Sequence, residues 1–142
     1  MPQCSLCSIE RNIVTREPHW TMCVNVDQAF LGRCYFALNR HETDVTALTQ
    51  EERDSLWALL GRAKAAIDKL FSPEHYNYVF LMNVDPHVHM HIIPRYAAQR
   101  QYGGRTFRDI RFGGQFDPQS SYVLPDEFIS DLASAIREAL PK

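Results

Sequence analysis

Three histidines alternate with apolar residues near the middle of the chain. His87, His89 and His91 are separated by Val88 and Met90. Alternate side chains of a β-strand point to opposite faces, so this spacing predicts three imidazoles in a row on one face and an apolar set on the other. A core strand with incidental histidines needs only the apolar set. Because three of the chain's six histidines fall at strict period two, we favour a functional row.

Two kinds of chemistry fit such a row. Neutral imidazole is a common zinc ligand, and neighbouring histidines on one strand face can share an ion. Alternatively, one imidazole nitrogen attacks a substrate while the other nitrogen keeps its proton, which an acceptor holds in place. The spacing alone is compatible with both.

A second group of potential ligands begins with a Cys-x-x-Cys pair, Cys4 and Cys7. Such a pair is typical of zinc sites and of redox centres, and it also arises by chance. A redox pair normally opens a helix after a strand, and the residues before Cys4 leave no room for that strand. His41 and His87 are available as two further ligands for a metal ion.

The stretch from His87 to Ile93 resembles the His-x-His-x-His-x-x signature of the histidine triad (HIT) family, in which x is apolar. Upstream, residues 31–36 are similar to the family's Gly-His-apolar strand and residues 38–41 to its Pro-Lys-x-His turn. The resemblance implies a nucleotide hydrolase or nucleotidyl transferase. The middle histidine, His89, would attack the α-phosphorus and form a nucleotidyl-histidine intermediate.

The same resemblance implies roles for the residues around His89. His91 would donate to a phosphate oxygen or to the leaving group, with help from Asn83, and His87 would border the nucleotide. Asn25 lies where the family often has a polar residue near the ribose; without the resemblance we would interpret it as a polar residue on an exposed face. The implied substrates are dinucleoside polyphosphates or nucleoside phosphoramidates, and the chemistry needs no cofactor.

Arg33 is a departure from the pattern, because many HIT enzymes have an additional histidine at this position. Arginine cannot share or relay a proton at neutral pH. Its side chain would instead bind phosphate of the nucleotide or face solvent. We expect turnover to be lower than with a histidine there.

Zinc-containing HIT proteins resemble this chain in a further respect. The resemblance implies a structural zinc held by Cys4, Cys7, His41 and His87. Four protein ligands in a tetrahedron leave no open position for catalysis. A metal-free core at this place remains the alternative.

Four runs rich in strand formers surround these residues: 20–26, 33–38, 76–83 and 87–93. The first two predict an antiparallel pair. The last two are separated only by residues 84–86, which are too few for a crossover helix, so we expect a second antiparallel pair.

Two helices complete the predicted fold. Thr49 and Glu52 form a capping-box pattern that begins an amphipathic helix, which ends before Pro73. Pro125 begins a second amphipathic helix that packs on its own domain or on a partner subunit. We therefore predict a single α+β, HIT-like domain over residues 1–142, with an antiparallel sheet of about four to five strands, one long helix and a C-terminal helix.

Residues 95–111 form a basic segment that contains paired glycines. Such a segment suits polyphosphate binding, and it equally suits a solvated loop whose charges balance acidic helices. Its arginines are Arg95, Arg100, Arg105, Arg108 and Arg111.

Composition limits the possible partners. The chain has 142 residues, 45% of them hydrophobic and 23% charged, and a formal net charge of −2. This charge gives no electrostatic footprint for nucleic acid, and no apolar run approaches the roughly 18 residues of a membrane span, so we expect neither as a partner. The N-terminus lacks the features of a signal peptide, and we expect a cytoplasmic protein. The family resemblance further implies a homodimer.

Two rivals to the enzyme hypothesis stay open. The first is a non-catalytic nucleotide-binding module, in which Arg33 and the short 84–86 connection have removed turnover. The second is a metal enzyme with zinc held by His87, His89 and His91.

Overall fold

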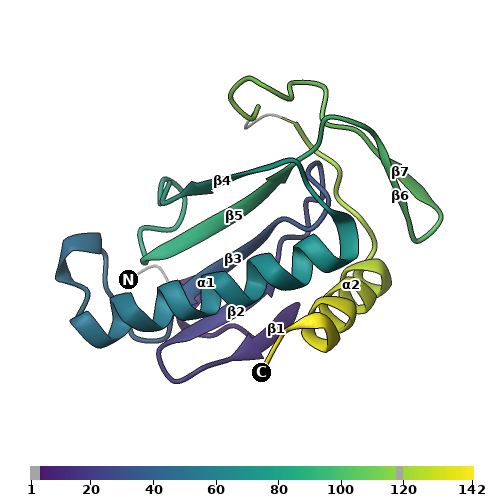
Figure 1. Cartoon of the computed structure of the whole chain (residues 1–142). Helices are drawn as coiled ribbons and strands as arrows, with labels where there is room; N and C mark the ends of the chain where they lie inside the picture. The colour runs from purple at the N-terminus through teal and green to yellow at the C-terminus, as the bar shows by residue number, and fades with distance from the viewer. Residues whose placement is uncertain (1–3, 118–119) are drawn as a thin grey trace.

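The computed structural model describes residues 4–117 and 120–142, so residues 1–3 and 118–119 of the predicted domain lie outside the described part. The fold is α+β, as predicted, with a five-stranded antiparallel sheet, a long helix and a C-terminal helix (Figure 1). None of the described helices is long and apolar enough to cross a membrane. The strands are β1 (Ile13–Arg16), β2 (Trp20–Val24), β3 (Cys34–Leu38), β4 (His75–Val79), β5 (His89–Arg95), β6 (Arg100–Tyr102) and β7 (Arg105–Phe107), and the helices are α1 (Gln50–Phe71) and α2 (Asp126–Ala139).

The strand that carries the histidines lies inside the sheet. The order is β1-β2-β3-β5-β4, and each neighbouring pair is antiparallel. Both predicted pairs, β2 with β3 and β4 with β5, are confirmed. Because β5 has a partner on each side, its backbone is held by two ladders of hydrogen bonds.

Both helices cover one face of the sheet, and the core lies between (Figure 1). The capping box at the start of α1 is present, with the Thr49 side chain accepting from the Glu52 amide and the Glu52 side chain accepting from the Thr49 amide. Helix α2 packs against α1 and the sheet of its own chain, with Ile129, Leu132 and Ile136 fully buried.

Two cross-strand rows of side chains mark the face opposite the helices. His89 pairs with Ala37, which pairs with Thr21. One step along the sheet, His91 pairs with Tyr35. The apolar partners Val88, Met90 and Ile92 belong to the core on the other side, as the alternation predicts.

The connection between β4 and β5 is longer than we predicted. Strand β4 ends at Val79 and β5 begins at His89, so residues 80–88 connect them instead of residues 84–86 alone. Pro86 has no backbone N–H to give to a ladder, and the Val88 amide donates to the Glu42 carbonyl instead. His87 therefore lies just before the strand and not in it.

The basic segment 95–111 is partly ordered as a hairpin and is not a simple solvated loop. Its middle is the β6–β7 hairpin. Arg95 is buried, at 2% exposure, and forms an ion pair with Asp109 in which Nε lies 2.7 Å from Oδ2. Arg100 pairs with Glu74. The first arginines of the segment thus hold the fold together.

Candidate functional site

His87 faces a cluster of metal-ligand types. Its Nε2 group donates to the Leu38 carbonyl oxygen at 2.6 Å, which leaves Nδ1 with the lone pair. Nδ1 lies 3.2 Å from the Cys4 sulfur, 3.5 Å from the Cys7 sulfur and 3.2 Å from His41 Nδ1. The structure therefore brings together the four residues that the sequence proposed as zinc ligands.

The geometry of this cluster fits a tetrahedral zinc ion. All four potential ligand atoms lie within 4.8 Å of one another, and the Cys7 sulfur is 3.3 Å from His41 Nδ1. Zinc bonds of about 2.0–2.3 Å place tetrahedral ligand atoms roughly 3.3–3.8 Å apart. A backbone carbonyl on the far nitrogen of His87 is the usual outer partner of a metal-bound imidazole.

A buried carboxylate supports the turn that carries His41. Glu52 of α1 accepts from Arg40 Nε at 2.8 Å and from Arg40 Nη2 at 2.9 Å. These hydrogen bonds from Arg40, the residue before His41, lower the pKa of Glu52 to about 2. Glu52 thus connects the capping box of α1 to the residue that precedes the potential metal ligand His41.

His89 presents a free nitrogen to the open face of the sheet. Its Nδ1 group donates to the His87 carbonyl oxygen at 2.7 Å, so Nε2 carries the lone pair. The ring is 7% exposed. The predicted backbone acceptor for the far nitrogen is therefore present, and the geometry suits a nucleophile.

His91 is the next ring along the strand, with its centroid 5.0 Å from that of His89. Its Nδ1 lies 3.4 Å from Nη2 of Arg33. Burial, followed by the nearby Arg33 charge and by His89, lowers the pKa of His91 to about 3. His91 is therefore neutral at physiological pH.

Two buried polar atoms near the end of β2 and β3 have no partner among the described residues: Asn25 Oδ1 and Arg33 Nε. The two residues are neighbours, because the Asn25 amide donates to the Arg33 carbonyl oxygen at 3.1 Å. Buried polar groups normally find partners. An acceptor and a donor left open beside His91 fit the polar groups of a ligand.

Sequence reasoning missed two residues of this site. Gln28 is fully buried; its amide nitrogen donates to the carbonyls of Asn25 and Arg33, and its oxygen accepts from Gly32. Tyr35 packs its ring near both His89 and His91, at centroid distances of 6.3 and 6.1 Å. The alternation of β3 places Tyr35 on a face, but only the register with β5 assigns it to the histidines.

Asn83 does not join the histidines in this structure. It is exposed in the 80–88 connection, and none of the described hydrogen bonds links it to His89 or His91. We predicted it at the end of a strand that in fact stops at Val79.

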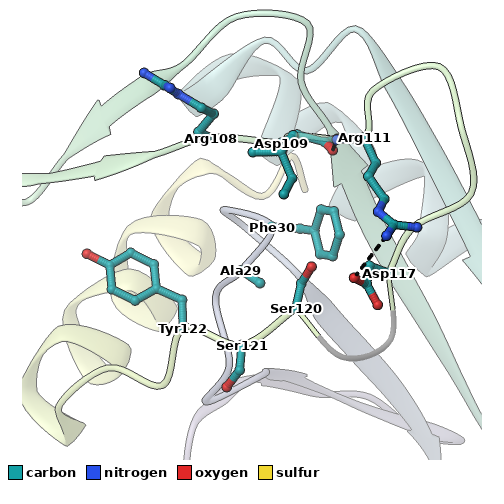
Figure 2. Close-up of a pocket in the computed structure, with 10 residues that line it drawn as sticks. Ala29, Phe30, Arg108, Asp109, Arg111, Asp117, Ser120, Ser121 and Tyr122 are labelled. Atoms are coloured by element: carbon teal, nitrogen blue, oxygen red, sulfur yellow. Dashed lines mark hydrogen bonds and ion pairs between the residues drawn. The ribbon is translucent and has the colours of Figure 1, made fainter.

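Two cavities border this face of the sheet. One, of about 300 Å³, is lined by Leu6, Ile9, Thr21 and Ala37, and Ala37 is the cross-strand partner of His89. The other, of about 320 Å³, is shown in Figure 2. It contains none of the predicted histidine-site residues, but it includes two arginines of the basic 95–111 segment; its lining is Ala29, Phe30, Arg108, Asp109, Ile110, Arg111, Asp117, Ser120, Ser121 and Tyr122.

Sequence comparison identifies a family match over most of the chain. The HIT domain family model matches residues 8–98. No protein of curated function matches the sequence.

Several solved structures superpose on the chain. A hypothetical histidine triad nucleotide-binding protein from Sulfolobus tokodaii has a TM-score of 0.71 at 18% identity, covering 96% of this chain and 91% of that protein. A zinc-bound histidine triad family protein from Mycobacterium smegmatis has a TM-score of 0.62 at 14% identity, with coverage of 92% and 84%. Diadenosine triphosphate hydrolase from Plasmodium falciparum, in complex with cyclomarin A, has a TM-score of 0.68 at 16% identity, with coverage of 92% and 77%. At such identities the superpositions establish the fold alone.

Proposed function

Because the chain belongs to the HIT domain family, whose match spans more than half of its residues, we propose that it binds a small nucleotide and acts on the α-phosphate as a hydrolase or nucleotidyl transferase. The observation that carries this proposal is the hydrogen bond from His89 Nδ1 to the His87 carbonyl oxygen. This bond fixes the ring so that Nε2, with its lone pair, is the nucleophile. Nearby, Asn25 Oδ1 and Arg33 Nε have no hydrogen-bond partner among the described residues and could contact a ligand.

The proposed reaction has two steps. His89 Nε2 attacks the α-phosphorus, a nitrogen–phosphorus bond forms, and the bond to the leaving group breaks with its electron pair on the leaving group. Water, or another acceptor in a transfer reaction, then attacks the same phosphorus; the nitrogen–phosphorus bond breaks with its electron pair on Nε2, and the proton of the attacking hydroxyl passes to solvent. The nucleoside monophosphate leaves and His89 is restored.

Neighbouring groups stabilise the charge on the phosphoryl oxygens in this scheme. His91 Nε2–H and the Arg33 guanidinium supply donors close to His89. Donors that face developing charge in a site with little water lower the barrier substantially. The open Asn25 oxygen is suited to accept from a ribose hydroxyl.

We also propose that Cys4, Cys7, His41 and His87 hold a structural zinc ion. Four of the six separations among the ligand atoms are 3.2–3.5 Å and all lie within 4.8 Å, which supports this assignment. Bound zinc would supply no chemistry to the reaction, since no position is open for substrate. The residue it fixes, His87, provides the carbonyl that orients His89.

We further propose that residues 1–142 act as one domain that forms a homodimer through the β4 edge. Strand β4 ends the sheet, so one side of it has no strand partner among the described elements. Beside it lies an apolar cavity of about 350 Å³ lined by Leu56, Trp57 and Phe80, and Trp57 is 65% exposed. An unpaired edge next to exposed apolar side chains favours pairing with a second copy.

Turnover of defined nucleotides tests the proposal. Purified protein should convert a dinucleoside polyphosphate or a nucleoside phosphoramidate to nucleoside monophosphate, as followed by chromatography. A His89→Asn variant should lose this activity, while His75→Asn, a change at an exposed histidine of β4, should keep it. Binding of adenosine monophosphate without any turnover of either substrate would support the non-catalytic module instead.

A further inference from the structure

The position of Arg33 gives His91 a fixed protonation state. A guanidinium has five N–H donors and no acceptor, so the close approach of Nη2 to His91 Nδ1, at 3.4 Å, requires the lone pair of the imidazole on Nδ1. The single ring proton is then on Nε2. A doubly protonated His91 would place two N–H groups against each other.

The backbone around Arg33 is held firmly enough to maintain this contact. Gln28, which is fully buried, donates to the carbonyl oxygens of Asn25 and Arg33 at 2.8 and 3.0 Å. It also accepts from the Gly32 amide at 2.7 Å. Gly32 has φ of +87°, a conformation that side chains rarely adopt. These contacts therefore hold the backbone of Arg33 in one position.

Arg33 makes no direct contact with a carboxylate. Among the described residues no ion pair includes Arg33, and its buried Nε has no partner. Burial lowers the pKa of Arg33, and the charge of Asp27 partly opposes this; Asp27 Oδ1 itself accepts from the amides of Ala29 and Tyr122 at 3.0 and 2.8 Å. A half-buried guanidinium with an unpartnered Nε fits an anionic group of a ligand.

We propose that Arg33 is a positioning residue that locks His91 as a neutral Nε2–H donor and thereby selects leaving groups that depart without a proton. This inference rests on the proposed function. A histidine acts as a general acid only when both nitrogens carry protons, and Arg33 occupies the nitrogen that would need the second one.

The consequence for the leaving group follows from proton balance. When the bond from the α-phosphorus to a phosphate oxygen breaks, the electron pair stays on that oxygen, and a phosphate-type group departs as a stable anion. When the bond runs to an amine nitrogen, the nitrogen must receive a proton as it departs. His91 can hydrogen-bond to either group but supplies that proton to neither. The substrate class favoured here is therefore a nucleotide with a phosphoryl leaving group, not an amine.

Nuclear magnetic resonance of ¹⁵N-histidine-labelled protein tests the lock without any turnover. In the wild type, the His91 ring should be protonated at Nε2 alone throughout neutral and mildly acidic pH. Arg33→Met, which removes the donor, should yield a mixture of tautomers, and Arg33→Lys should restore part of the Nε2–H form. Arg11→Met, at an exposed ion pair with Asp126, is the matched control for loss of one charge. A wild-type ring protonated at Nδ1, or an Arg33→Met spectrum equal to that of the wild type, would overturn the assignment.

The hydrolysis rates of two adenylates that differ only in the leaving group test whether Arg33 selects the leaving group. The wild type should strongly prefer the phosphate leaving group over the amine. Arg33→His should raise the relative rate of the amine substrate by about tenfold or more, a fraction of the ~10²–10⁴ that general acids contribute. An unchanged ratio of the two hydrolysis rates in Arg33→His would overturn the inference, even if the protein still hydrolyses both substrates. A locked His91 tautomer in a protein that hydrolyses neither substrate would instead contradict the proposed function.

Discussion

At the residue scale, the three histidines of one motif have two patterns of ring hydrogen bonds, since the lone pair is on Nδ1 in His87 and His91 and on Nε2 in His89. The Leu38 carbonyl accepts a hydrogen bond from Nε2–H of His87, and the His87 carbonyl accepts one from Nδ1–H of His89. Arg33 donates to Nδ1 of His91. The free lone pairs consequently face the Cys4–Cys7 side for His87 and the open face for His89. One residue type thus suits the three roles proposed for it, which are metal ligand, nucleophile and hydrogen-bond donor.

Removal of two metal ligands should remove the metal. Wild-type protein expressed with sufficient zinc should contain about one equivalent, and the Cys4→Ala, Cys7→Ala double variant should retain less than about half, with a clear loss of thermal stability. The control is Cys34→Ala, which removes a buried thiol outside the cluster. Elemental analysis provides the measurement, and full zinc retention by the double variant would exclude these ligands.

The sequence predicts much of this site because the spacing of His87, His89 and His91 is visible in it. It does not predict which ring nitrogen is free, since that depends on distant groups such as the Leu38 carbonyl and Arg33. The family resemblance does place His87 beside His41, and their ring centroids are 5.2 Å apart, but the sequence does not predict that His87 lies before the strand and not in it. These outcomes depend on where β5 begins.

At the scale of elements, the N-terminus of α1 is coupled through Glu52 to Arg40 in the turn that follows β3. Its folded-state pKa, about 2, lies below the ordinary value of 4.5, so the stability it contributes is present above pH 4.5 and is lost as the pH falls toward 2. Glu52→Gln should therefore lower the free energy of unfolding at pH 7, and the difference from the wild type should shrink in that acidic window.

Urea unfolding at a series of pH values measures this difference. Glu51→Gln is the matched control, because Glu51 is in the same first turn and is exposed. Both variants and the wild type keep the four proposed zinc ligands, so release of any bound zinc at low pH is common to all three proteins. A Glu52→Gln effect that stays constant from pH 7 to pH 3 would contradict the role of the ionised carboxylate.

The ion pair between Arg95 of β5 and Asp109 ties the segment after β7 to the sheet. Both side chains are almost completely buried, at 2% and 1% exposure. Asp109→Asn leaves the guanidinium buried without its counter-ion, and we expect a loss of about 3–5 kcal/mol in the free energy of unfolding. Asp131→Asn, an exposed position on α2, should change it little. A loss below about 1 kcal/mol for Asp109→Asn would show that this pair does not anchor the segment.

Most elements could be predicted because their signals are local. The Thr49–Glu52 capping box begins α1, and the apolar spacing after Pro125 gives α2. Residues 80–88 could not be predicted, since Val79 and His89 are fixed as strand ends by pairing with β5 and β3. The role of Arg95 could not be predicted either, because the sequence around this basic residue does not indicate that it pairs with Asp109 in the interior.

At the scale of the whole molecule, the exposed edge β4 and the side chain of Trp57 predict self-association. Trp57→Lys should weaken the dimer by at least about tenfold, because it places a charge in the apolar contact. Ile110→Lys is the control, since Ile110 is 77% exposed but lines the cavity of about 320 Å³ and not the one beside Trp57. Sedimentation velocity over a range of concentrations measures the effect, and a wild type that is monomeric throughout would contradict the dimer.

Formation of a covalent intermediate on His89 tests the proposed reaction most directly. Wild-type protein mixed briefly with an α-phosphate-labelled dinucleoside polyphosphate and quenched in base should carry acid-labile label, and peptide mass spectrometry should locate it on His89. The label should be absent from His89→Asn, with turnover reduced by at least about 10³-fold, and present in His75→Asn. Label on another residue, or undiminished hydrolysis by His89→Asn, would contradict His89 as the nucleophile.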